Sequence, residues 1–463
     1  MLARTMVSLG RWATRLPAPL RRLLRLVAGA LADRSAPGAE DWSMALVGGG
    51  TVADLRQLSR VAPPLSEPAA GVPGLRVVVL TSVLDVGGLD EFVALLSRGL
   101  AARGAVVEIV IALDPVGWAG RLAETLTGEG FTVRTASRST LGELLASAEP
   151  DVVSIHDAPG WAVAEVARLG VPQIEVLHGA GATFDADPAV LAQRVARLDG
   201  VVAVSELVRR QFLALAPGFA PERAWTIPNG AWSRAQPPVV RDQARAALRL
   251  EDEFLFVSLA RHALQKNGYG LVAAFDEVAA ARPEAHLVIA GRVDSRRYFA
   301  QVATLAQASA FADRIHLRDH TPDPVALMAA ADCFVLDSFF EGWSLATTEA
   351  MTSGLPVVLS DVAGAREQLT VPAGGEPVGI LVGNPGGDLE VSWETVSASR
   401  FRRQPNHDEL VAALTRMVVE RDVWAARRDR MAAEASQRFD PQRCLDRHAE
   451  LLQQAATAAR ATG

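Results

Sequence analysis

Two blocks of alternating strand-like and helix-like segments constrain the fold of this chain more than any other feature of its sequence. Short apolar runs rich in β-branched residues recur along residues 75–229 and again along residues 254–382, with helical patterns between them. Uninterrupted apolar runs are typical of strands buried on both faces of a parallel sheet, and the helices between them make the crossovers. The sequence therefore predicts an α/β protein with two Rossmann-like, doubly wound parallel-sheet domains that face each other across a cleft.

The predicted strands and domain boundaries follow from these runs. Strand candidates lie at residues 75–81, 106–113, 131–135, 152–156, 173–178 and 201–205 in the first block, and at 254–260, 285–290, 314–318, 331–336, 357–359 and 380–382 in the second. A chain of 463 residues is long enough for two or three domains. We expect a first domain at 74–232, a polar, proline-bearing linker at 233–253 and a second domain at 254–425.

Residues 338–367 hold the densest group of candidate functional side chains, and they read SFFEGWSLATTEAMTSGLPVVLSDVAGARE. A buried-strand pattern leads into a turn, and Ser344 is well placed to cap the helix that follows. In open parallel sheets, ligands bind at the carboxyl ends of strands, beside helix N-termini whose free N–H groups suit a phosphate. The candidate substrate-binding residues of this turn and helix start are Glu341, Gly342, Trp343, Ser344 and Leu345.

The spacing of two acids in this stretch limits its chemistry. Glu341 and Glu349 are eight residues apart, mostly along a helix, which separates them by about 12 Å at ~1.5 Å per residue. A retaining glycosidase needs its two carboxyl groups only about 5 Å apart. The two acids therefore fit separate contacts on one long ligand with an anion between them, which is the shape of a nucleotide sugar.

Two cations follow the first strand of the second block. Arg261 and Lys266 are five residues apart on a predicted strand-to-helix loop, and Lys266 is the only lysine among 46 basic residues. A planar guanidinium fork and a point-like ammonium together suit a diphosphate. We therefore expect this loop to bind phosphate groups, although an exposed cation pair without a ligand is the simpler alternative.

The 338–367 stretch resembles the signature of the retaining nucleotide-sugar glycosyltransferases of the two-domain GT-B type, the group 1 or family-four glycosyltransferases. That signature has a glutamate, seven residues, a second glutamate, Ala-Met, Gly-x-Pro-Val-Val and a turn ending in glutamate. Its places are filled here by Glu341, Glu349, Ala350, Met351, Gly354, residues 356–358 and residues 363–367. The resemblance extends over residues 75–452, and it implies the GT-B fold, with closing helices at 426–463 that pack back on the first domain.

This resemblance also implies an activity. The protein is expected to transfer a hexose-type sugar from a nucleoside diphosphate to an acceptor hydroxyl with retention of anomeric configuration, without a protein nucleophile, cofactor or metal. Glu341 would bind sugar hydroxyls, Glu349 the ribose, and Arg261 with Lys266 the diphosphate. The base, UDP or GDP or another, stays open, and the expected acceptor is a glycan or a lipid-linked molecule in bacterial polysaccharide, glycolipid or other glycoconjugate synthesis.

The first block supplies fewer candidates. His178 ends a predicted strand before flexible glycines, and in similar enzymes a histidine at this place lies near the donor sugar and the reaction centre. The Gly87-Gly88 pair follows the first strand, where the family carries a glycine loop that faces the donor phosphates. A hydrogen-bonded turn histidine and a plain glycine turn are the structural alternatives. His156, which ends the preceding strand, is assigned to structure.

Composition excludes several other classes of protein. The formal net charge of -7 argues against general nucleic-acid binding. Two cysteines, Cys333 and Cys444, cannot build a disulfide framework or a cysteine metal site. His262 and the irregular, arginine-bearing residues 383–406 are interpreted as solvated loops.

Residues 1–73 differ from the rest of the chain and are interpreted as a basic amphipathic extension and linker. Residues 1–34 carry seven arginines against one acid, with leucines and a valine on one helical face from Leu20 to Leu31. Such a helix can lie on an anionic membrane, and a helix packed on the protein itself or a transit peptide are the alternatives. We expect a cytoplasmic protein that associates peripherally with the inner face of the membrane.

Three other functions are alternatives. Two of them, a phosphorylase and an epimerase, have the same architecture, and the third is a protein without catalytic activity. A phosphorylase would hold pyridoxal phosphate on a lysine, but the single lysine, Lys266, is already placed at the phosphate site. A nucleotide-sugar epimerase would need a carboxylate base in the cleft and would release free UDP without an acceptor. A catalytically inactive carbohydrate-binding scaffold is disfavoured by the intact charged positions.

Overall fold

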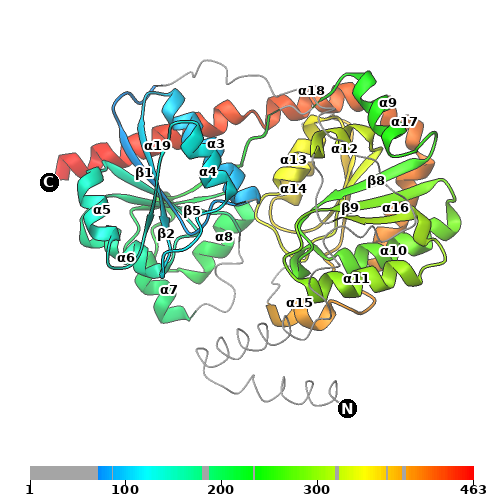
Figure 1. Cartoon of the computed structure of the whole chain (residues 1–463), viewed down its shortest axis with the longest axis horizontal. Coiled ribbons are helices and arrows are strands. Elements are labelled where there is room, and N and C mark those ends of the chain that lie inside the picture. Colours follow the sequence, from blue (N-terminus) through cyan, green and yellow to red (C-terminus); the bar gives the residue numbers. More distant parts are fainter. Residues whose placement is uncertain are drawn as a thin grey trace, which may run out of the picture.

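The computed structural model describes residues 71–85, 87–179, 187–232, 235–318, 323–371, 374–387 and 393–462. They form two α/β domains that lie next to each other, each built around a parallel sheet with helices packed against it (Figure 1). The predicted pair of doubly wound parallel-sheet domains is confirmed. The membrane-binding prediction for residues 1–34 lies outside the described residues.

The first sheet has seven parallel strands in the order β3-β2-β1-β4-β5-β6-β7. Its strands are β1 (Arg76–Thr81), β2 (Val106–Ala112), β3 (Thr132–Ala136), β4 (Val152–His156), β5 (Gln173–Leu177), β6 (Gly200–Ala203) and β7 (Ala224–Thr226). Its helices are α3 (Gly88–Ala102), α4 (Arg121–Gly128), α5 (Leu141–Ala148), α6 (Gly160–Arg168), α7 (Pro188–Val195) and α8 (Glu206–Leu215). Every residue of the central strands β4 and β5 is buried, including the polar residues Ser154, His156, Gln173 and Glu175.

The second sheet has six parallel strands in the order β10-β9-β8-β11-β12-β13. Its strands are β8 (Phe254–Leu259), β9 (Ala285–Ala290), β10 (Ile315–Arg318), β11 (Cys333–Leu336), β12 (Val357–Ser360) and β13 (Gly379–Val382). Its helices are α10 (Gly268–Ala281), α11 (Arg296–Ala308), α12 (Pro324–Ala330), α13 (Leu345–Thr352), α14 (Ala365–Leu369), α15 (Trp393–Ser399), α16 (His407–Val419) and α17 (Arg421–Ala425).

The stretch expected to be a linker, residues 233–253, contains a helix. Helix α9 (Pro238–Ala247) packs against α12 and therefore belongs to the second domain. Its buried residues Val240 and Ala244 are four positions apart, so they share the face that is turned to the domain. The polar and proline-rich composition of the stretch hid this short apolar stripe.

The closing helices divide between the two domains. Helix α18 (Arg428–Arg438) packs against α13 of the second domain, whereas α19 (Pro441–Thr462) packs against α3 and β4 of the first (Figure 1). The expectation that residues 426–463 all pack on the first domain therefore needs correction for α18. Met431 and Ala435 of α18 are buried four residues apart, and this apolar stripe attaches it to the second domain.

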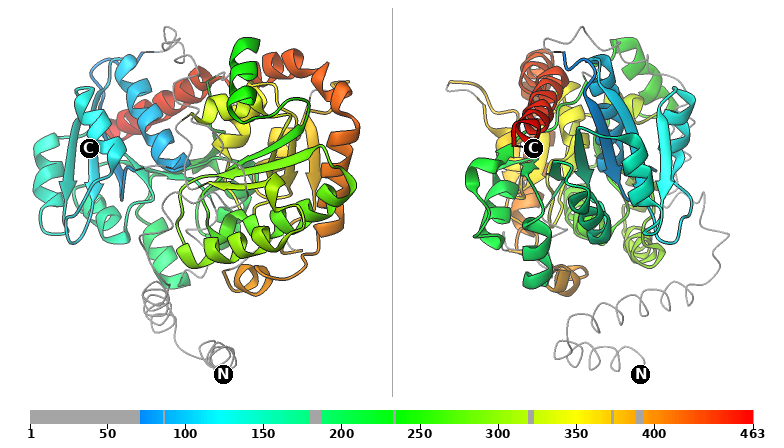
Figure 2. Two further views of the ribbon diagram at one scale, coloured as in Figure 1. Left: turned by 45° about the vertical axis from the view of Figure 1, so that its right-hand side comes forward. Right: turned by 90° about the vertical axis from the view of Figure 1, so that its left-hand side faces the viewer.

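Helix α19 is attached to the first domain by polar and steric contacts. The buried guanidinium of Arg103 donates to Asp446 Oδ1 at 2.5 Å and to Gln442 Oε1 at 2.8 Å. A Cβ on Gly99 would lie 2.5 Å from Leu445 Cδ2, so this glycine lets α3 and α19 approach closely. Figure 2 shows α19 running along the first domain after α18.

The chain passes between the domains at two neighbouring places. Ala231 N donates to Phe439 O at 3.0 Å, and a Cβ on Gly230 would lie 2.4 Å from Pro441 Cα. The outgoing and returning segments thus lie side by side with their backbones in contact. No helix among the described residues is both long and apolar enough to span a bilayer.

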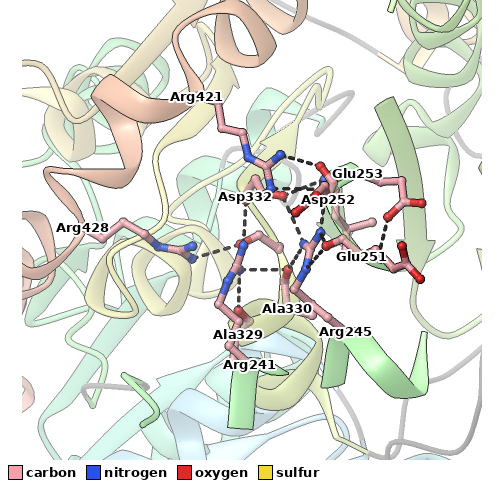
Figure 3. A network of polar contacts seen from close by, with 12 residues as sticks. Arg241, Arg245, Glu251, Asp252, Glu253, Ala329, Ala330, Asp332, Arg421 and Arg428 are labelled. Atoms are coloured by element: carbon pink, nitrogen blue, oxygen red, sulfur yellow. Dashed lines mark hydrogen bonds and ion pairs between the residues drawn. The ribbon is translucent and has the colours of Figure 1, made fainter. Parts of the chain in front are cut away.

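A cluster of arginines around Asp332 attaches helices α9, α17 and α18 to the second sheet at the amino end of β11 (Figure 3). Arg241 of α9 donates to Asp332 Oδ1 at 2.7 Å, and Arg421 of α17 lies 3.6 Å from the same oxygen. Arg428, at the start of α18, donates to Ala331 O at 3.0 Å, and burial lowers its pKa to about 10. The cluster fixes α9, α17 and α18 as one body with the second domain.

Candidate active site

The turn before α13 is held in place by side chains of its own domain. Ser344 caps the helix, its Oγ accepting from Thr347 N at 3.1 Å, as the sequence predicts. Trp343 is buried, and its Nε1 donates to Thr348 Oγ1 at 3.0 Å. Gln368 Nε2 adds a hydrogen bond to Ser344 O at 2.9 Å. These contacts fix the direction in which the first N–H groups of α13 point.

This turn touches the first domain. Gly342 forms an isolated β-bridge with Gly179, and a Cβ on Gly342 would lie only 1.9 Å from His178 O. Only glycine can occupy this position, because a side chain would overlap the backbone of the other domain. The sequence predicts Gly342 as a site residue. Its contact with Gly179, just beyond the end of β5, shows that it also joins the two domains.

Lys266 and Glu341 form a direct ion pair. Lys266 Nζ lies 2.5 Å from Glu341 Oε1, and the same oxygen accepts from Ser338 Oγ at 2.6 Å. Both charged side chains are largely buried, at 16% and 10% exposure. The two loops are further joined by Gln265 Nε2, which donates to Phe340 O at 2.8 Å. Two residues predicted to bind different parts of one ligand are thus in contact.

Arg261 lies on the same loop as Lys266 but has a different partner. Its guanidinium pairs with Asp294, which also accepts from Arg292 Nε at 2.9 Å. Arg292 NH1 in turn lies 2.8 Å from Asp85 Oδ2 of the first domain, and Asp85 accepts from Arg121 at 2.9 Å. A line of alternating charges therefore crosses from one domain to the other beside the site.

The N-termini of α3 and α13 lie close together where the two domains touch. Gly87 and Gly88 begin α3, and a Cβ on Gly88 would lie 3.8 Å from Leu345 Cδ1 at the start of α13. Each helix N-terminus carries a partial positive charge and unpaired N–H groups. Burial raises the pKa of Asp90, in the first turn of α3, to about 6. The two helix ends form an arrangement suited to an anion.

His178 is bound to a second histidine. Its Nε2 lies 2.9 Å from Nδ1 of His156, which is fully buried at the end of β4. Burial lowers the pKa of His178 to about 3, so its imidazole is neutral at ordinary pH. The sequence marked His178 for the cleft but gave no sign that His156 contacts it, because strand pairing brings the two together.

Glu349 lies at the fifth position of α13, and its side chain is partly exposed. Glu341 lies in the turn that precedes this helix, three residues before its N-cap Ser344. The backbone carbonyl of Glu349 accepts from Ser353 N at 3.0 Å within the last turn.

A buried polar network lies directly behind the Lys266 loop. Asn267 Nδ2 donates to Asp337 Oδ2 at 2.7 Å, and Asn406 Nδ2 donates to Asp337 Oδ1 at 2.7 Å. Gln404 exchanges two hydrogen bonds with Asn267, at 2.6 and 2.7 Å. Burial raises the pKa of Asp337 to about 7. The interpretation of residues 383–406 as a solvated loop is therefore wrong for its end, which is buried here.

Two further predictions about this region need correction. His262 is buried rather than solvated, because its Nε2 is hydrogen-bonded to Arg318 O at 2.6 Å and its ring packs on Phe299. Residues 393–399 form α15, whose Val396 packs with Phe339 and Phe340 beside the site. Aromatic and valine residues at helical spacing were the available signal for α15.

Metal-binding groups are not assembled in the described part of the chain, where no cluster of three or more His, Cys, Asp or Glu side chains has a suitable arrangement. The sequence contains two closely spaced aspartates, Asp-x-Asp, at residues 185–187, a pattern that could bind a metal ion. The second of them, Asp187, caps α7, where it accepts a hydrogen bond from Ala189 N at 2.8 Å. A small pocket under the α13 turn is lined by Glu341, Ser344, Thr347 and Gln368 among others.

Two family models match the two domains. Residues 240–383 match "Glycosyl transferases group 1", and residues 86–231 match "Glycosyltransferase Family 4". The chain is 28% identical over 341 residues to D-inositol 3-phosphate glycosyltransferase 1 of Catenulispora acidiphila, covering 67% of this chain and 79% of that protein. It is 28% identical over 186 residues to the lipopolysaccharide core biosynthesis mannosyltransferase LpsB of Rhizobium meliloti, covering 38% of this chain and 52% of that protein.

Solved structures of the same fold agree with this. HepE from Anabaena, solved with UDP and glucose, superimposes with a TM-score of 0.67 at 18% identity, covering 82% of this chain and 100% of HepE. Sucrose-phosphate synthase from Thermosynechococcus elongatus gives a TM-score of 0.63 at 19% identity, covering 83% of this chain and 100% of that one. The two-sheet architecture and the family models agree: the chain has the GT-B fold, and each of its two domains matches a glycosyltransferase family model.

Proposed function

We propose that the protein transfers a hexose-type sugar from a nucleoside diphosphate to an acceptor hydroxyl, with retention of configuration and without a metal. One observation carries the proposal: the Lys266–Glu341 pair, 2.5 Å apart, lies at the turn where the N-termini of α3 and α13 meet. A cation and two helix N-termini suit a diphosphate, and a carboxylate next to them suits sugar hydroxyls.

The leaving diphosphate gains negative charge as the glycosidic bond breaks. In this proposal Lys266 exchanges its contact with Glu341 for one with the diphosphate, and Arg261 assists from the same loop. The N–H groups at the start of α13 bind the remaining phosphate oxygens. Hydrogen-bond donors that are already fixed in place stabilise a developing charge without reorganisation. In enzymes that stabilise their transition state in this way, the loss of one donor lowers kcat by about 10²–10³-fold.

The other site residues bind the neutral parts of the donor. Glu341, released from Lys266, accepts hydrogen bonds from sugar hydroxyls, and Glu349 of α13 accepts hydrogen bonds from the ribose hydroxyls. A neutral His178 exchanges hydrogen bonds with the sugar from the first domain, and its low pKa makes it a poor proton donor at neutral pH. With the attacking hydroxyl on the same face as the leaving group, the configuration is retained.

The donor nucleotide is proposed by likeness. HepE, which shares the fold, has been solved with UDP and with UDP-glucose. The named relatives act on different acceptors, from D-inositol 3-phosphate to the lipopolysaccharide core. We propose a glycan or lipid-linked acceptor, bound on the first-domain side of the contact between the domains.

A binding series tests the diphosphate assignment. Wild type is screened by thermal shift against UDP, GDP and ADP, and the preferred diphosphate is compared with its monophosphate by calorimetry. Lys266→Ala is expected to weaken diphosphate binding by about 10–100-fold, the ~1.5–3 kcal/mol of a charge-assisted hydrogen bond, and to weaken monophosphate binding much less. Arg416→Ala, an exposed arginine on α16, serves as the control.

Transfer assays complete this test. Lys266→Ala is expected to lower the rate of sugar transfer at least a hundredfold, whereas Arg416→Ala keeps the wild-type rate. Near-wild-type transfer by Lys266→Ala would contradict the assignment. Release of the free nucleoside diphosphate without an acceptor, with conversion of the donor sugar, would instead support an epimerase.

We also propose that the protein works in the cytoplasm, with residues 1–34 on an anionic membrane surface. The support is the excess of arginine over acid in this segment and its single apolar stripe. Wild type should float with liposomes that contain anionic lipid, whereas a chain lacking residues 1–70 should not. Equal flotation of both proteins would reject the proposal.

A further inference from the structure

A hydrogen-bonded chain of three side chains ends at His178 of the candidate active site. Ser154 and His156 lie two residues apart on β4, so both point to the same face of the sheet, and Ser154 Oγ lies 2.9 Å from His156 Nε2. His156 Nδ1 in turn lies 2.9 Å from His178 Nε2, just beyond the end of the neighbouring strand β5. Ser154 and His156 are buried at 1% and 0% exposure.

We propose that His156, with Ser154 behind it, is a positioning residue that fixes the ring orientation and the tautomer of His178. The inference rests on the proposed function, in which His178 contacts the donor sugar. A contact between two imidazole nitrogens needs one N–H donor and one bare acceptor, so the tautomer of one ring determines that of the other. The remaining nitrogen of His178, Nδ1, then has a defined role toward a ligand.

The surroundings keep this chain neutral and rigid. The ring of Phe92 on α3 contacts His156, His178 and His448, with centroids 6.1, 5.3 and 5.4 Å away. His448 comes from α19, so the returning helix closes this cluster. Burial lowers the pKa of all three histidines, and neutral rings are the condition under which a single tautomer can be selected.

A second pair of neighbouring histidines in this protein lacks the short hydrogen bond of the His156–His178 pair. His286 and His316 are the second residues of the neighbouring strands β9 and β10, and their rings stack with centroids 5.8 Å apart. Their closest nitrogens are 3.5 Å apart, which is too long for a strong hydrogen bond. This pair lies at the amino ends of its strands, away from the carboxyl ends where the candidate site is built. It provides a matched control.

Two substitutions at position 156 separate positioning from simple packing. The amide of asparagine reaches the place of the histidine Nδ1, whereas the longer glutamine amide reaches the place of Nε2. His156→Asn therefore keeps a partner for His178, and His156→Gln keeps only the partner for Ser154. We expect His156→Asn to retain kcat within about threefold and His156→Gln to lose at least about tenfold in kcat, each with an unchanged donor KM.

His316→Gln is the control for the loss of a buried histidine and should retain the wild-type kcat. Equal kcat in His156→Asn and His156→Gln, whether high or low, would overturn the proposal, because a packing role does not distinguish the two amides. A wild type that transfers no sugar would refute the proposed function instead.

A spectroscopic readout tests the inference without any turnover. The ¹⁵N signals of the His178 imidazole, assigned with a His178→Phe variant, report which nitrogen carries the proton. We expect one tautomer in wild type and in His156→Asn, and a changed or mixed tautomer in His156→Gln. Identical ¹⁵N signals of His178 in all three proteins would overturn the proposal.

Discussion

Asp337 is a buried residue behind the site whose pKa is strongly raised, and this shift makes the stability of the protein depend on pH. Its carboxyl is 1% exposed and accepts hydrogen bonds from Asn267 and Asn406, while Lys266 precedes Asn267 in the chain. These two amides favour the ionised form, but burial outweighs them and raises the pKa from 3.8 to about 7. The protonation state of Asp337 therefore changes within the range in which enzymes work.

This shift predicts a pH-dependent effect of Asp337→Asn. The folded state holds the proton up to about pH 7 and the unfolded state only up to pH 3.8, so the wild type loses stability as pH rises between these values. At ~1.4 kcal/mol per pKa unit, the loss is about 4 kcal/mol. The free energy of unfolding of Asp337→Asn, measured relative to wild type, should rise from pH 5 to about pH 7 and then level off. A difference that does not change with pH would contradict the shifted pKa.

The sequence singles out candidate site residues one by one, but it does not reveal which side chains they contact. Glu341, Lys266 and Ser344 could be recognised from strand ends, helix caps and charge, because these signals are local. The Lys266–Glu341 pair joins residues 75 positions apart, and the His156–His178 contact depends on which strands are neighbours. Periodicity reports burial and local conformation, but it carries no information about which buried side chains meet.

At the scale of elements, most strands were predictable, but the three-residue strand β7 and helix α9 were not. The apolar, mostly β-branched residues of β4 and β5 marked them as buried strands, although each strand also buries two polar residues, Ser154 and His156 in β4 and Gln173 and Glu175 in β5. Helix α9 was missed because only Val240, Ala244 and Arg245 are buried among its ten residues, a narrow stripe within polar and proline-rich sequence. Short helices that pack on one neighbour give the weakest sequence signal.

The two segments that connect the domains give a prediction about Gly230. A Cβ at this position would lie 2.4 Å from Pro441 Cα and 2.8 Å from Pro441 N, both backbone atoms that cannot rotate away. Gly230→Ala should therefore destabilise the protein by about 1–3 kcal/mol, the usual cost of overpacking. Gly218→Ala, where a Cβ would have no neighbour within 4 Å, should change stability by less than about 0.5 kcal/mol. Calorimetry of both variants measures this, and equal melting temperatures would show that the segments can separate freely.

At the scale of the whole molecule, the two domains are held together by contacts around the site. Glu206 N, at the start of α8 in the first domain, donates to both carboxylate oxygens of Glu367, at 2.9 and 3.2 Å. Arg292 and Asp85 form a second interdomain contact at 2.8 Å. Glu367 thus supplies a negative charge to a helix N-terminus of the other domain, which is a stabilising arrangement.

Removal of this carboxylate should favour an open arrangement of the domains. We expect Glu367→Ala to have a larger radius of gyration than wild type in small-angle X-ray scattering, because the α8 N-terminus loses its partner. Glu409→Ala is the matched control, since Glu409 Oε2 accepts from Gly383 N at 2.7 Å within the second domain. A radius of gyration that is the same in all three proteins would show that Glu367 does not hold the domains together.

The return of α19 to the first domain has a consequence for how the protein is made. Arg103, at the end of α3, finds its partners Gln442 and Asp446 more than 330 residues later in the chain. At a synthesis rate of ~5–20 residues per second, the ribosome reaches α19 roughly 20–70 s after it has finished α3. During that time Phe92 and Gly99 of α3 lack the cover that His448 and Leu445 of α19 later provide. The second domain, whose sheet and helices all lie between the two segments that connect the domains, can meanwhile complete its own core. The domain that is translated first is therefore the one that finishes folding last.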